Sequence, residues 1–63
     1  MTLITREQLA RMAIETLWQL LHDPRLAGCT PYEAARRIGL KEGAARLVEK
    51  WWDGPAVFPG ERG

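Results

Sequence analysis

The sequence predicts an all-α domain of three helices followed by an irregular tail, and three observations lead to this prediction. Two segments open with a capping box, in which a threonine is followed three residues later by glutamine or glutamate. Apolar residues recur at helical spacing in the first segment and again after residue 43. Prolines and glycines separate these segments and fill the end of the chain. We therefore expect one helical domain over residues 1–54 and an irregular tail over residues 55–63.

The first helix is expected over Arg6–His22. Thr5 and Gln8 form its capping box. It should end before Pro24, because the residue before a proline is pushed out of the helical region. The face of this helix that should enter the core consists of Leu9, Met12, Ala13, Leu17 and Leu20.

A second apolar stripe lies beside that face and consists of Ala10, Ile14, Trp18 and Leu21. A small helical unit cannot cover both stripes, and the second stripe can be covered in two ways. Val57 and Phe58 of the tail can fold back over Ile14 or Trp18, or these residues can form a surface for another chain. A homodimer that buries the second stripe is the expected form of the latter, because a chain of 63 residues has only a small core.

The second and third helices are expected over Pro31–Ile38 and Glu42–Trp52. Thr30 and Glu33 form the capping box of the second helix, and Pro31 occupies its first turn, where no amide hydrogen is needed. Gly39 can adopt the left-handed conformation that ends a helix. These helices should contribute Ala35, Ile38, Leu40, Ala45 and Val48 to the core.

Between Pro31 and Lys50, small, apolar and turn-forming residues occupy six characteristic positions. These residues are Ala35, Ile38, Gly39, Leu40, Ala45 and Val48. On these positions the segment resembles the helix-turn-helix of small bacterial and phage DNA-binding proteins. Such a unit needs a small residue where the helices cross, a glycine at the turn and apolar residues facing the core. The resemblance implies a helix-turn-helix over residues 30–52, with the last helix lying in the major groove of DNA.

The resemblance implies a DNA-binding regulator or packaging factor of a phage or mobile element, which binds double-stranded DNA as a homodimer. Lys41 and Arg46 can bond guanine or phosphate, and the other basic side chains can add phosphate contacts. Glu42 opposes phosphate and Leu47 is apolar on a face that should be wet. The candidate DNA-binding residues are Arg36, Arg37, Lys41, Gly43, Arg46 and Lys50.

A protein-interaction module, or a small phage-type inhibitor on the same scaffold, is the alternative function. The formal net charge of only +1 favours it over a strong polyanion binder. Trp51 and Trp52 point about 100° apart on a helix, so one of them is left to pack on the tail, a protein partner or a nucleobase. The candidate interface residues are Ile14, Trp18, Leu21, Leu47, Trp52 and Phe58.

Composition argues against several other classes of protein. Cys29 is the only cysteine and His22 the only histidine, so we expect no disulfide within the chain, no structural zinc site and no other metal or cofactor. Serine is absent, and no phosphate-binding glycine loop or carboxylate pair is visible, so we expect no catalytic residues and no enzyme. The start MTLITREQ does not resemble a signal peptide, and no apolar run nears the roughly 20 residues of a membrane span. We expect a cytoplasmic protein.

Overall fold

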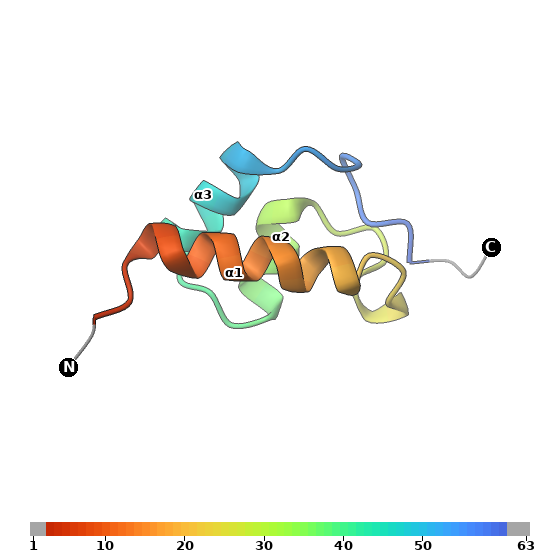
Figure 1. The fold of residues 1–63 in the computed structure, drawn as a ribbon. Helices are drawn as coiled ribbons and strands as arrows, with labels where there is room; N and C mark the ends of the chain where they lie inside the picture. Colours follow the sequence, from red (N-terminus) through yellow and green to blue (C-terminus); the bar gives the residue numbers. More distant parts are fainter. Residues whose placement is uncertain (1–2, 61–63) are drawn as a thin grey trace.

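A computed structural model describes residues 3–60, and within them the fold consists of helices without any strand (Figure 1). The prediction of an all-α domain with three α-helices is confirmed. Residues 55–60 contain neither helix nor strand, and residues 61–63 of the expected tail lie outside the described part of the chain. The elements are α1 over Arg6–Gln19, a short 3-10 helix η1 over Pro24–Leu26, α2 over Pro31–Arg37 and α3 over Glu42–Trp51.

Both predicted capping boxes are formed. The backbone N–H of Gln8 donates to Thr5 Oγ1 over 3.2 Å, and the N–H of Thr5 donates to Gln8 Oε1 over 3.0 Å. Thr30 and Glu33 make the same reciprocal pair over 3.2 and 3.0 Å. Each box satisfies two backbone N–H groups that a helix start otherwise leaves unpaired, which is why both starts could be read from the residues.

The end of α1 differs from the prediction. The helix stops at Gln19 and not at His22, and Leu20 is its C-cap residue. The N–H of Asp23 donates to the Leu20 carbonyl oxygen over 2.9 Å, which turns the chain before η1. The Asp23 carboxylate then caps η1 by accepting from the Arg25 amide over 2.8 Å. The local bonds of this turn therefore end α1 earlier than proline alone requires. The other two helices each end one residue before the predicted position, at Arg37 and Trp51.

Gly39 forms the turn between α2 and α3 with a positive φ of 106°. Its N–H donates to the Arg36 carbonyl over 3.1 Å, and the N–H of Leu40 donates to the Ala35 carbonyl over 3.0 Å. These two bonds form a Schellman motif, which pairs carbonyl groups at the end of α2. The prediction that Gly39 ends the helix in a left-handed conformation is confirmed. An L side chain at this φ would be strained.

Helix α3 packs against both α1 and α2, whereas α1 and α2 contact each other less. In Figure 1, α1 runs along much of the molecule, which measures 43 × 19 × 17 Å. Small side chains dominate the buried set, and they allow the helices to approach closely. The buried apolar residues are Ala10, Ala13, Leu17, Leu26, Cys29, Ala34, Ala35, Ala44, Ala45, Val48 and Phe58.

The predicted core face of α1 is partly wrong. Leu9 is 40% exposed and Met12 is 56% exposed, so neither belongs to the core. The predicted core residues Ala13 and Leu17 are buried, and Ala10, which was assigned to the second stripe, is buried with them. Of the other predicted core residues, Ala35, Ala45 and Val48 are buried, and three are half-buried against the core: Leu20, Ile38 and Leu40.

The tail folds back on the helical domain and completes the core. Phe58 is only 1% exposed. Its N–H donates to the Cys29 carbonyl, and its own carbonyl accepts from the Gly28 N–H, each over 2.8 Å. This reciprocal backbone pair fixes the tail beside the segment that precedes α2. The tail thus folds back on the domain, as in the first of the two coverings, and the covering of the second stripe of α1 by another chain stays a prediction.

Candidate functional site

Helix α3 exposes one face to solvent and buries the opposite face. Ala44, Ala45 and Val48 are buried, and Gly43 and Leu47 are half-buried. The exposed face carries two acidic and two basic side chains, so it has no net charge of its own. These four residues are Glu42, Arg46, Glu49 and Lys50.

Glu42 and Arg46 form an ion pair along this exposed face. Arg46 Nη2 and Nε donate to Glu42 Oε2 over 2.8 and 3.1 Å. These hydrogen bonds lower the pKa of the Glu42 carboxyl and raise the pKa of the Arg46 guanidinium. The guanidinium also lies 5.9 Å from the centroid of the Tyr32 ring. Arg46 is thus held in position over α2, with 67% of its side chain still exposed.

The amino end of α3 gathers positive charge from four parts of the fold. Lys41 is its N-cap residue, and it makes no side-chain capping bond to the free amides of the first turn. Arg36 of α2 donates weakly to the Leu40 carbonyl over 3.5 Å. Arg6 of α1 lies over Gly43, where an added Cβ would be 3.1 Å from Arg6 Cδ. With Arg46, four cations surround a helix end whose N–H groups already carry partial positive charge.

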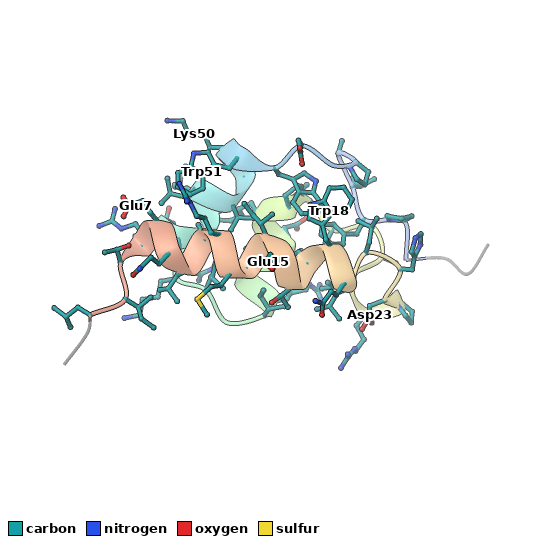
Figure 2. All side chains as sticks on the ribbon, in the orientation of Figure 1. Glu7, Glu15, Trp18, Asp23, Lys50 and Trp51 are labelled. Atoms are coloured by element: carbon teal, nitrogen blue, oxygen red, sulfur yellow. The ribbon has the colours of Figure 1, made fainter. Side chains whose placement is uncertain are left out.

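Most of the sequence-predicted DNA-binding residues lie at or near this end. Arg36, Lys41 and Arg46 belong to it, and Gly43 forms its surface. Lys50 lies at the other end of α3, where Figure 2 shows it pointing away from the molecule. Arg37 is separate and lines a hollow of about 340 Å³ with residues of η1 and the end of α1.

Arg6 also belongs to this end of α3, although it is not among the residues predicted from the sequence. It lies in the first turn of α1, and nothing in the local sequence links it to α3. Arg6 comes close to α3 only in the tertiary structure, because α1 packs against α3 and the Arg6 side chain reaches Gly43. Gly43 contributes by leaving space for the Arg6 side chain.

The residues predicted to form a protein interface are largely engaged within the chain. Trp18 stacks on Trp52 with ring centroids 4.9 Å apart, and Trp52 stacks on Phe58 at 5.3 Å. Trp52 Nε1 also donates to the Pro55 carbonyl over 2.9 Å. Phe58 has its ring covered by its own chain, while Trp18 keeps 43% of its surface exposed. The remaining interface candidates are half-buried and pack against the core: Ile14, Leu21 and Leu47.

Trp18, in the stripe of α1 that was expected to form a homodimer, is therefore covered in part by Trp52 at the end of α3. Exposed apolar side chains are found elsewhere, near the start of α1. Leu3 and Ile4 precede the helix and are 84% and 57% exposed, and Leu9 and Met12 follow them on its surface. The homodimer itself stays a prediction.

Trp51 takes the other orientation available to the adjacent tryptophans. It is 37% exposed, and the Arg11 guanidinium lies 5.8 Å from its ring centroid. Figure 2 shows Trp51 between α3 and α1. This cation–π contact ties the carboxyl end of α3 to the middle of α1.

Within residues 3–60, no group of three or more His, Cys, Asp or Glu side chains is arranged to hold a metal ion. No helix there is long and apolar enough to cross a membrane. Cys29 is a free, buried thiol in the core.

Comparison with protein-family models, with curated proteins and with solved structures gave no match to this chain.

Proposed function

We propose that this protein binds double-stranded DNA through the amino end of α3. The observation that carries the proposal is the gathering of Arg6, Arg36, Lys41 and Arg46 around an uncapped helix start. These cations come from α1, α2, the turn and α3, so positive charge is in excess at this end although Glu42 offsets the charge of Arg46. Double-stranded DNA is the expected partner because the uncapped helix follows a glycine turn, as in the helix-turn-helix.

Phosphate is the DNA group that this surface suits best. The first-turn amides of Glu42, Gly43 and Ala44 are free of side-chain caps, and a helix start attracts anions. Lys41 and Arg6 are exposed beside these amides. A phosphate that approaches the helix end would meet both side-chain and backbone donors.

The amino end of α3 has few side chains that could recognise DNA bases. Gly43 and Ala44 have no polar side chain, and Glu42 is bound to Arg46. Only Lys41 and Arg46 can reach the acceptors of guanine. We therefore propose binding dominated by the DNA backbone, with weak sequence preference and strong dependence on salt.

The test is a salt titration of binding to a fluorescein-labelled duplex of random sequence, followed by anisotropy. With about four phosphate contacts, affinity should fall about 100-fold between roughly 50 and 200 mM salt. Lys41→Ala should reduce the logarithmic salt slope by about one, because it removes one phosphate contact. The fold should stay intact, since the Lys41 side chain makes no capping bond.

Arg25→Gln is the matched control. Arg25 is equally basic but is bound to Asp23 over 2.8 Å in η1, away from α3. Its substitution should leave the slope unchanged. If the wild-type protein fails to bind the duplex at low salt, or if Lys41→Ala and Arg25→Gln behave alike, the proposal is wrong.

A further inference from the structure

A groove opens between the first turns of α1 and the turn that leads into α3. It has a volume of about 630 Å³ and is open to solvent on one side. Such a volume lies within the usual range of about 300–1,000 Å³ for ligand sites, and it can accept one or two large side chains. The lining residues are Arg6, Leu9, Gly39, Leu40, Lys41, Gly43 and Ala44.

The floor of this groove is apolar. Leu9 and Leu40 contribute aliphatic side chains and Ala44 a methyl group. Gly39 leaves its place empty of side-chain atoms, while the Arg6 side chain lies over Gly43. Leu9 is 40% exposed here although it lies on a helix that packs in the core. A ligand that covered it would remove apolar surface from water.

The rim of the groove is positive. Arg6 and Lys41 line it, and the first-turn amides of α3 add their partial charge. Its lining includes no acidic residue, and the neighbouring Glu42 is already paired with Arg46. Charge complementarity therefore selects an acidic occupant, and the floor selects an apolar one.

We propose that this groove docks a segment of a partner protein that places a leucine-sized side chain on the floor and a flanking Asp or Glu against Arg6 and Lys41. DNA alone does not fit this description, because its charged phosphates would bury little apolar surface on Leu9 and Leu40. The proposal goes beyond DNA binding and stands without it. Both ligands use Lys41, so they compete where both bind.

The experiment follows the backbone amide signals of ¹⁵N-labelled protein during titration with a synthetic peptide of about 12 residues. The peptide carries two leucines one helical turn apart, flanked by glutamates. The signals of Gly39 and Gly43 should shift in a saturable way, because both residues line the groove. Gly28 does not line the groove and is paired with Phe58 of the tail, so it serves as the internal reference.

Two protein variants test the two halves of the site. Leu9→Ser should weaken peptide binding about 10-fold or more, and Lys41→Gln should weaken it several-fold and reduce its salt dependence. The matched controls are Met12→Ser, which removes a similarly exposed apolar side chain outside the groove, and Lys50→Gln, which removes a cation at the far end of α3. Both should leave the affinity unchanged.

Two peptide variants complete the test, since a peptide with serine in place of leucine and one with lysine in place of glutamate should each fail to bind. The proposal is overturned if Gly39 and Gly43 do not shift. It is also overturned if Leu9→Ser and Met12→Ser bind the peptide equally, or if the serine peptide binds as well as the leucine peptide. Should Leu9→Ser lose its folded spectrum, Lys41→Gln and the peptide variants decide the matter.

DNA binding is tested separately by titrating the same labelled protein with duplex alone. A contact with DNA phosphates should survive Leu9→Ser, whereas docking of the peptide should not. Peptide docking and duplex binding are therefore measured separately, so the failure of this proposal can be distinguished from the failure of DNA binding.

Discussion

The indole ring of Trp18 in α1 stacks on the ring of Trp52 at the end of α3, with centroids 4.9 Å apart and planes inclined by 24°. Phe58 stacks on Trp52 in turn, at 5.3 Å and 19°. The three rings connect the first helix, the last helix and the tail. The tail is thus a structural part of the domain, and its loss should expose the core beneath it.

Phe58→Ala should destabilise the domain strongly. The ring is almost fully buried and is the largest side chain in the core, so its truncation should cost about 3–5 kcal/mol. A domain this small has little stability to spare, and thermal unfolding followed by circular dichroism should lose its cooperative transition. Val57→Ala is the control, because Val57 is 50% exposed and its truncation should have only a small effect. Equal melting curves for the two variants would contradict the role of the tail.

Gly39→Ala and Gly43→Ala should change stability in opposite directions. Gly39 has a φ of 106°, and an alanine there should cost about 1–2 kcal/mol of conformational strain although no atom obstructs its Cβ. Gly43 lies in the first turn of α3, and a Cβ there would meet only the flexible side chain of Arg6. Alanine at that position should raise stability by up to about 1 kcal/mol through helix propensity. Urea denaturation of the two variants checks both signs, and a neutral Gly39→Ala would contradict the turn geometry.

Asp23 should make the stability depend on pH in the acid range. Its hydrogen bonds with the Arg25 side chain and amide lower the pKa of the carboxyl from 3.8 to about 2. Since the folded pKa lies below the unfolded value, the stabilisation is complete above about pH 4 and is lost as the pH falls towards 2. Asp23→Asn should therefore flatten the decline in melting temperature between pH 4 and 2, as measured by circular dichroism. Parallel profiles for the wild type and this variant would show that the Asp23–Arg25 pair does not contribute.

The features that were predicted correctly from the sequence depend on residues close together in the chain. The capping boxes at Thr5 and Thr30 and the Gly39 turn involve atoms only a few positions apart, so composition and spacing decide them. The early end of α1 was missed because the competing bonds of Asp23 become visible only once η1 is formed.

Rotation of α1 about its axis could not be decided from the sequence, because two apolar stripes lie side by side on the helix. The buried face combines Ala10 of the second stripe with Ala13 and Leu17 of the first, and it leaves Leu9 and Met12 exposed. The candidate site shows the same division. Its cations on α2 and α3 were read from the local motif, whereas Arg6 joins them only through the packing of α1.

The ion pair between Glu42 and Arg46 offers the most direct test of DNA binding at the amino end of α3. The pair joins a group that should repel phosphate to one that should bind it, over 2.8 Å on the exposed face of one helix. Both substitutions remove the same salt bridge, so its loss alone cannot give opposite effects. The measurement is the affinity for random-sequence duplex DNA across salt for Glu42→Gln and Arg46→Ala.

We predict that Glu42→Gln binds several-fold more tightly than the wild type at low salt, because it removes a negative charge and releases Arg46. Arg46→Ala should bind more weakly, with a salt slope smaller by about one. If both variants move the affinity in the same direction, or if neither changes it, α3 does not bind DNA by this end.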